Sequence, residues 1–117
     1  MINTEHIRQL QQRVETLGRC IAIDEKRADV EKRQERTLAA DFWDDPKEAE
    51  KFLKELAGVK FWVTGYDEVS SAVEDLNVLH DFAKESLDGA SEDAVTPEVE
   101  ELDQAYKAAL ESLETLE

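Results

Sequence analysis

The chain has 117 residues and a formal net charge of −15, because 29 Asp and Glu stand against 14 Lys and Arg. Its length suits one domain rather than two. Its 4 Gly and 2 Pro are typical of long helices rather than of sandwiches or barrels. A single cysteine excludes an internal disulfide framework, and we recognise neither a signal peptide nor an apolar run of the ~20 residues that span a membrane. We therefore expect one all-α, cytoplasmic domain over residues 1–117.

The charge is unevenly distributed along the chain. Residues 1–40 carry eight basic and seven acidic side chains, whereas residues 41–117 carry six basic and twenty-two acidic ones. A surface this acidic repels phosphate backbones, so we expect no direct binding of nucleic acid. A basic protein partner fits the charge, and a solvated helical surface without a partner is the alternative interpretation.

A first helix is predicted over residues 4–38. Its apolar residues repeat at 3-4-3-4 spacing, which places them on one face: Ile7, Leu10, Val14, Leu17 and Ile21. Beyond Ile21 this stripe weakens, because charged residues occupy most of the segment 24–36. Gly18 lies inside the helix and is a candidate position for a kink.

A second helix is predicted over residues 46–87. Pro46 suits the first helical position and Asp45 is a strong N-cap; Glu48, three residues after Asp45, completes a capping-box pattern. Apolar residues then follow at helical spacing as far as residue 87. Gly58 and Gly65 lower the helix propensity, but no proline interrupts the segment, so we expect a continuous helix.

A third helix is predicted over residues 97–116, after a turn-rich connection in which Gly89 can end the second helix. Its apolar seam has regular spacing: Val99, Leu102, Tyr106, Ala109, Leu113 and Leu116. Two long helices and a shorter third predict an elongated, antiparallel, coiled-coil-like bundle of three helices. The third helix is expected to cover residues 5–21 and 66–87.

Residues 22–63 are then left as a two-helix arm with a thinner core. Basic side chains of its first helix are expected to face Glu48, Glu50 and Glu55 across the arm: Lys26, Arg27, Lys32, Arg33 and Arg36. Exposed pairs of this kind contribute only ~0–1 kcal/mol each, but they favour the antiparallel register.

Two bulky rings, Phe42 and Trp43, lie at the turn between the first two predicted helices, among aspartates and just before Pro46. One interpretation is structural: Phe42 or Trp43 packs against Ala49 and Phe52 and closes the open end of the arm, as in a hydrophobic staple. The alternative is that these rings are exposed and dock on a partner.

A second candidate partner surface lies in the middle of the predicted second helix. At 100° per residue Phe61 points away from the apolar stripe, and Gly58 and Gly65 lie on the same side as Phe61. An aromatic ring between two glycines suits the close approach of another helix, either the third helix or a partner. A lone exposed ring is the simpler alternative.

The sequence contains no recognisable catalytic or metal-binding pattern. The cluster Asp41, Asp44 and Asp45 lacks the spacing and the central glycine of a calcium-binding loop. Cys20 has no histidine arranged around it and is expected to be a buried or half-buried structural thiol. Phosphate-binding loops and nucleophile elbows are also missing. We therefore predict no enzyme activity, no cofactor and no metal.

The segment DFWDDPKEAEK, residues 41–51, resembles the N-terminal domain of bacterial class-I peptide chain release factors, in particular the type that reads UGA and UAA. IAIDEKRADVEKRQE, residues 21–35, is similar to the basic helix that precedes this motif in the family. YDEVSSAVEDLNVLHDFAKE, residues 66–85, is similar to the family's long second helix, and LESLETLE, residues 110–117, to the helix before the next domain. The resemblance covers nearly the whole chain.

This resemblance implies a fragment, because neither the Ser-Pro-Phe codon-reading tripeptide nor the Gly-Gly-Gln loop of a complete release factor occurs here. It implies a non-catalytic domain that docks at the stalk base of the large ribosomal subunit, through a basic ribosomal protein, during translation termination. The alternative is a freestanding acidic scaffold or chaperone-like adaptor unrelated to translation. A reading frame that continues past Glu117 into both motifs would decide for the first hypothesis.

Overall fold

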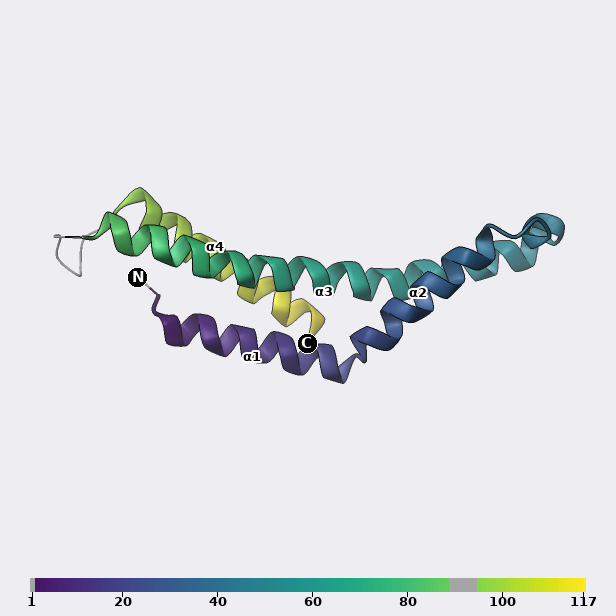
Figure 1. Cartoon of the computed structure of the whole chain (residues 1–117), viewed down its shortest axis with the longest axis horizontal. Coiled ribbons are helices and arrows are strands. Elements are labelled where there is room, and N and C mark those ends of the chain that lie inside the picture. Colours follow the sequence, from purple (N-terminus) through teal and green to yellow (C-terminus); the bar gives the residue numbers. More distant parts are fainter. Residues whose placement is uncertain (1, 89–94) are drawn as a thin grey trace. The chain divides into compact units, whose positions relative to one another are not determined.

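The computed structural model describes residues 2–88 and 95–117, and every regular element within these ranges is helical. The all-α prediction is therefore confirmed for the described residues. The elements follow one another in the order α1 (Thr4–Cys20), α2 (Ile23–Thr37), the 3-10 turn η1 (Phe42–Asp44), α3 (Pro46–Ser86) and α4 (Pro97–Leu116) (Figure 1). Gly89, predicted to end the second helix, lies outside the described residues. Within them, no helix combines the length and the apolar character that a bilayer span requires.

The prediction of a single first helix over residues 4–38 is wrong, because the helix is interrupted between α1 and α2. Ala22 adopts left-handed backbone angles, φ 52° and ψ 56°, which cost a non-glycine residue roughly 1–2 kcal/mol. The Lys26 ammonium group donates a hydrogen bond to the Ile21 carbonyl, one of the carbonyls that a helix end leaves without a helical partner. The interruption lies four residues beyond Gly18, the predicted position of a kink.

The interruption changes which residues face the core. A continuous helix would carry the stripe of α1 from Ile21 onward to Asp24, a charged residue. After the left-handed residue Ala22, the buried positions are instead Ile23 and Val30, with 8% and 9% of their surfaces exposed. Two β-branched apolar side chains are thereby buried while Asp24 stays exposed, and their burial offsets the backbone strain.

The chain divides into two compact units. The first unit contains the described residues of 1–17 and 67–117, that is, most of α1, the C-terminal half of α3, and α4. Its core is formed by the predicted apolar seams of these three helices: Ile7, Leu10, Val14, Leu17, Val69, Val73, Leu76, Ala83, Val99, Leu102, Ala109, Leu113 and Leu116. The periodicity of the sequence therefore predicted this core closely.

One contact just before α1 and one in its second half define how it runs beside α4. The Ile2 amide donates to the Asp103 carboxylate at 3.4 Å, and the Arg13 guanidinium forms an ion pair with the Glu117 carboxylate. Low residue numbers of α1 thus lie beside low residue numbers of α4, and high beside high. The two helices are therefore parallel to each other.

Helix α3 contributes to both units and is unbroken through Gly58 and Gly65, as predicted. A 2.7 Å hydrogen bond joins the hydroxyls of Ser86, the last residue of α3, and Thr96, the residue before α4. Because the end of α3 lies beside the start of α4, these two helices are antiparallel. Thr96 also caps α4 by accepting a hydrogen bond from the Val99 amide.

The second unit, residues 18–66, is an antiparallel pair of α2 and the N-terminal half of α3. Its core is smaller, as predicted for a two-helix arm, and comprises Ile23, Val30, Phe42, Ala49 and Leu56. Arg33 joins the helices: its guanidinium lies 5.4 Å from the centroid of the Phe52 ring and 3.2 Å from the Glu55 carboxylate. This is one of the predicted pairings across the arm.

Gly18 belongs to this unit and has a packing role there. A Cβ atom at position 18 would lie 2.8 Å from the Tyr66 hydroxyl oxygen and 3.1 to 3.2 Å from two carbons of its ring. The absence of a side chain at position 18 therefore allows the Tyr66 ring to lie against the last turn of α1. The Arg27 guanidinium lies over this ring at 5.9 Å.

Candidate functional site

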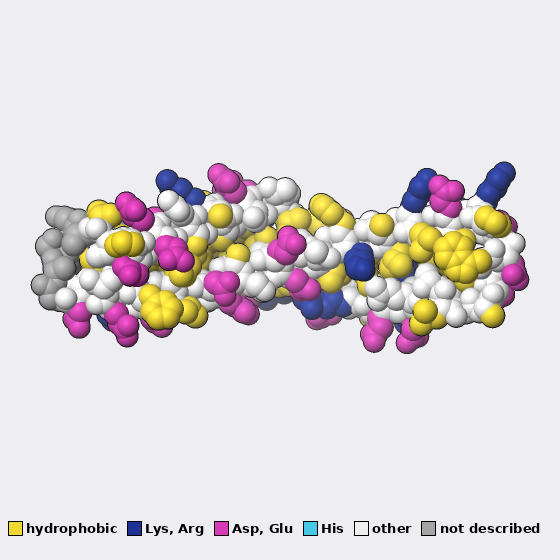
Figure 2. All heavy atoms as spheres, turned by 90° about the horizontal axis from the view of Figure 1, so that it is seen from above, with side chains coloured by type: hydrophobic (Ala, Val, Ile, Leu, Met, Phe, Trp, Pro, Cys, Tyr) yellow, Lys and Arg dark blue, Asp and Glu magenta, His cyan; other side chains and the backbone are white. Residues whose placement is uncertain are grey.

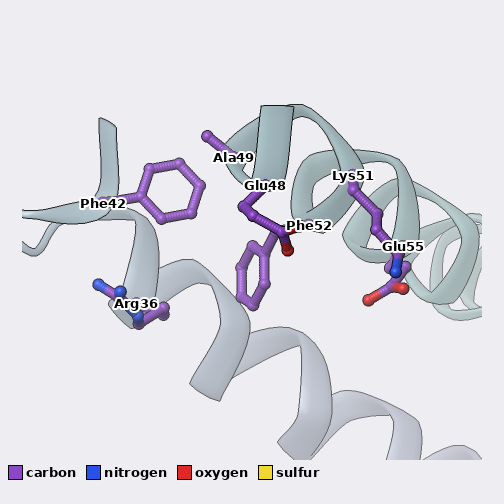
Figure 3. A pocket seen from close by; sticks show the side chains of 7 residues that line it. All are labelled: Arg36, Phe42, Glu48, Ala49, Lys51, Phe52 and Glu55. Carbon is purple, nitrogen blue, oxygen red and sulfur yellow. The ribbon is translucent and has the colours of Figure 1, made fainter. Parts of the chain in front are cut away.

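The turn before α3 holds the two rings that the sequence singles out, and the structure gives them different environments. Phe42 is buried, with 6% of its surface exposed, and its ring meets Phe52 edge to face at 5.5 Å (Figure 3). The Arg36 guanidinium lies 5.8 Å from the centroid of the Phe42 ring. Phe42 thus packs against the start of α3 in the manner of a hydrophobic staple, although it lies three residues before the N-cap Asp45.

Trp43 contacts Phe42 edge to face at 4.9 Å but keeps 60% of its surface exposed. It therefore contributes little to the core of the second unit. The consequence is that the structural and docking interpretations of this pair apply to different rings: Phe42 closes the core and Trp43 faces solvent.

The start of α3 is capped by its own sequence. The Asp45 carboxylate accepts hydrogen bonds from the amides of Lys47, at 3.2 Å, and Glu48, at 3.3 Å, and Pro46 is the first helical residue. Among the hydrogen bonds of the described residues, the return bond from the Asp45 amide to the Glu48 side chain is missing. This half of a capping box still satisfies two of the amides that a helix start leaves free.

A pocket of about 290 Å³ lies beside this turn, lined by Arg36, Phe42, Glu48, Ala49, Lys51, Phe52 and Glu55 (Figure 3). Its lining carries two basic and two acidic side chains around two aromatic rings. Because these charges balance, the pocket offers no preference for a charged ligand, and we assign it to the packing of the turn.

The second predicted surface, around Phe61, is open in the structure. Phe61 is 63% exposed and meets the neighbouring Trp62 edge to face at 5.9 Å. A Cβ atom added at Gly58 would meet nothing within 4 Å, and Gly65 is half-buried. Within the described residues of the second unit, no helix packs closely on Gly58.

Almost all of the net negative charge of the chain is carried by the first unit. Residues 67–117 carry sixteen acidic and two basic side chains, and the charges of residues 1–17 cancel. The second unit, residues 18–66, carries eleven acidic and ten basic side chains. A net charge of −14 therefore accompanies the first unit and −1 the second, so the excess of acidic over basic side chains lies in the first unit.

A groove between α3 and α4 lies on this acidic unit. It has a volume of about 550 Å³ and is lined by Leu79, Phe82, Glu85, Ser86, Glu98 and Glu101. The sequence analysis did not predict this groove. The signal for it was Phe82, a bulky apolar residue beside the apolar stripe of α3, which is 55% exposed in the structure. Figure 2 shows hydrophobic side chains bordered mainly by acidic ones at the left of the view, over α3 and α4.

The described residues offer no catalytic or metal-binding arrangement. No group of three His, Cys, Asp or Glu side chains within them is placed to hold a metal ion. The Cys20 thiol is exposed, so the prediction of a buried or half-buried thiol is wrong; the chain turns away from the helical path directly after Cys20. A hydrogen bond to Glu117 raises the pKa of Arg13, and hydrogen bonds to Asp29 and Glu55 raise the pKa of Arg33. Both arginines therefore remain cationic and serve in ion pairs.

Comparison with known proteins finds similar sequences among bacterial peptide chain release factors. The chain is 28% identical over 111 residues to peptide chain release factor 2 of Streptomyces avermitilis, an alignment that covers 95% of this chain and 29% of that protein. It is 33% identical over 109 residues to peptide chain release factor 2 of Corynebacterium aurimucosum, covering 87% and 28%. The same factor of Pseudarthrobacter chlorophenolicus is 28% identical over 101 residues, covering 86% and 27%.

No protein-family model matches the chain, and no solved structure does. The chain spans less than a third of the length of the curated relatives it matches. Over most of its own length, it is therefore similar to a segment of peptide chain release factor 2.

Proposed function

We propose that this chain is the non-catalytic N-terminal docking domain of a peptide chain release factor that acts in translation termination at UGA and UAA codons. The proposal rests on the coverage of the alignments, which include 86–95% of this chain but only 27–29% of each relative. Such a match is what one domain of a larger release factor gives. The Gly-Gly-Gln and Ser-Pro-Phe strings, which the resemblance assigns to the other domains, do not occur in this chain.

The partner that we propose is the stalk base of the large ribosomal subunit in the cytoplasm, contacted through a basic ribosomal protein. The charge distribution supports this choice, because the first unit carries a net charge of −14. Complementary charge on a partner speeds association and orients it. The same charge argues against direct contact between this unit and ribosomal RNA, whose phosphates it repels.

Ribosome co-sedimentation tests this partner. We expect the 117-residue chain to pellet with 50S subunits at low salt and to be released as salt rises, because exposed charges are screened over ~8–10 Å at physiological ionic strength. The matched control is 30S subunits, which carry the same kind of RNA and no stalk base. Equal pelleting with both subunits, or no pelleting with either, would contradict the proposed partner.

A release assay tests the non-catalytic role. Acyl transfer requires an activated nucleophile or a positioned base, and the described residues present neither. The isolated chain should therefore not release peptide from ribosomes stalled at UGA, UAA or UAG. Codon-dependent release above background would contradict this role. No release together with no pelleting on either subunit would favour the freestanding scaffold or adaptor.

A further inference from the structure

The groove between α3 and α4, lined by Leu79, Phe82, Glu85, Ser86, Glu98 and Glu101, has the features of a binding surface for a helix. Its apolar floor is incompletely covered: Leu79 is half-buried, Phe82 is 55% exposed, and the neighbouring Val78 is 54% exposed. Apolar side chains gathered on one helix face and left in water gain free energy when a second surface covers them.

The rim of the groove has one sign of charge. Glu85 comes from α3, Glu98 and Glu101 come from α4, and no Lys or Arg among the described residues lines the groove. Among the described residues, no salt bridge is seen at these three carboxylates, and the ion pairs of Arg8 and Arg13 in the same unit involve Glu5 and Glu117 instead. The three groove carboxylates are therefore available to a partner's cations, in contrast to the balanced charges of the pocket beside Phe42.

The arrangement of the helices indicates the kind of segment that fits. Helices α3 and α4 are antiparallel, and α1 contributes to the same core as both. At 100° per residue, Ala105 and Ala108 lie on the same flank of α4 as Glu101, so the side chains beyond the groove on this flank are small. A fourth helix laid along this groove would complete a four-helix arrangement.

We propose that the α3/α4 groove binds an amphipathic helix of a partner protein, with apolar side chains seated on Leu79 and Phe82 and Lys or Arg side chains placed against Glu85, Glu98 and Glu101. This is helix-in-groove recognition, in which apolar anchors at i, i+3, i+4 and i+7 supply affinity and flanking charges supply orientation. The inference goes beyond the proposed function, because it names a surface and a partner chemistry that do not depend on the ribosome.

The probe is a designed 18-residue peptide with Leu on one helical face and Lys on the other, about 27 Å long when helical. One control peptide has the same composition in scrambled order. The other keeps the pattern but has Glu in place of Lys. Fluorescence anisotropy of labelled peptide, titrated with the 117-residue protein, measures affinity. We expect saturable binding of the amphipathic basic peptide, at least tenfold tighter than that of either control peptide.

Matched protein variants locate the site. Phe82→Ser should weaken binding at least tenfold, whereas Phe61→Ser, which removes a comparably exposed ring from the second unit, should change it less than twofold. Amide resonances of the first unit around Phe82 and Glu98 should shift on binding. Circular dichroism verifies that each variant remains helical.

Two double variants that lose the same charge distinguish contacts at the groove from general attraction between the acidic protein and the basic peptide. Glu98→Gln with Glu101→Gln should weaken binding about tenfold, whereas Glu100→Gln with Glu111→Gln, which removes the same charge from exposed residues of α4 that do not line the groove, should leave it within twofold. Equal losses in the two double variants, equal binding of the scrambled peptide, or resonance shifts confined to the second unit would overturn the proposal. Peptide binding without ribosome binding would contradict only the proposed function.

Discussion

Replacing Phe42 and Trp43 separately by alanine tests how the turn before α3 is stabilised. Phe42 is 6% exposed and contacts both Phe52 and Trp43 edge to face. Removing a buried phenyl ring typically costs ~3–5 kcal/mol, and the adjoining pocket of about 290 Å³ lets water and side chains relax into the space. We therefore expect Phe42→Ala to lower the free energy of unfolding by about 2–4 kcal/mol.

Trp43→Ala should cost much less. Its ring is 60% exposed and meets the Phe42 ring edge to face at 4.9 Å. An edge-to-face aromatic pair contributes ~0.5–1.5 kcal/mol beyond area burial, and exposure reduces that contribution, so we expect a loss of about 1 kcal/mol or less. The sequence alone allowed either ring to pack on Ala49 and Phe52; the burial of Phe42 makes the two variants distinguishable.

Urea unfolding, monitored by tryptophan fluorescence, measures the free energy of unfolding of the second unit in both variants. The two tryptophans of the chain, Trp43 and Trp62, both belong to the second unit, and Trp62 remains as a reporter in Trp43→Ala. Circular dichroism reports the whole chain alongside. A loss for Trp43→Ala equal to or larger than that for Phe42→Ala would refute the assignment of Phe42 as the packed ring.

Two further predictions concern the backbone. Gly18→Ala should destabilise the second unit by about 1 kcal/mol, because the new Cβ would lie 2.8 Å from the Tyr66 hydroxyl oxygen and overpacking of ~1–3 kcal/mol exceeds the gain in helix propensity of ~1 kcal/mol. Gly58→Ala, with nothing within 4 Å, has only that gain and should stabilise the unit by ~0.5–1 kcal/mol. Urea unfolding of the two variants should therefore give shifts of opposite sign, and shifts of the same sign would contradict the close packing at Gly18. Ala22→Gly should stabilise the chain by ~0.5–1 kcal/mol, because glycine removes left-handed strain that exceeds its greater unfolded-state entropy; a destabilised variant would show that Ala22 is not left-handed in solution.

The sequence predicted the helical content and the core of the first unit well, for a physical reason. A buried helix face repeats every three to four residues, so Ile7, Leu10, Leu102 and Leu113 could be assigned to the core from their spacing alone. The start of α3 was equally readable, because Asp45 and Pro46 act through local hydrogen bonding and backbone geometry.

The interruption after α1 could not be predicted in this way. Alanine is the strongest helix former, so nothing local to Ala22 signals a left-handed conformation. The gain comes from burying Ile23 and Val30, one of which lies eight residues further along the chain. Gly18, the local signal for a kink, instead accommodates Tyr66, a residue 48 positions away in sequence.

The candidate surfaces were only partly predictable. Exposure of Phe61 follows from its angle to the apolar stripe of α3. The α3/α4 groove depends on which flanks of the two helices meet. That Phe82 and Glu98 line the same groove could be inferred only with the register between α3 and α4 in hand. Which unit carries the acidic charge likewise requires the division of α3 between the two units.

The most direct test of the docking-domain proposal is a domain exchange in a complete release factor. The segment of Streptomyces avermitilis peptide chain release factor 2 that aligns with this chain is replaced by the chain, and a second variant lacks the segment altogether. Rates of peptide release are then measured on ribosomes stalled at UGA, UAA and UAG. We expect the exchanged factor to recover most of the release at UGA and UAA that the deletion loses, with no release at UAG. Release by the exchanged factor that is no faster than by the deletion variant, when both are folded, would contradict the proposal.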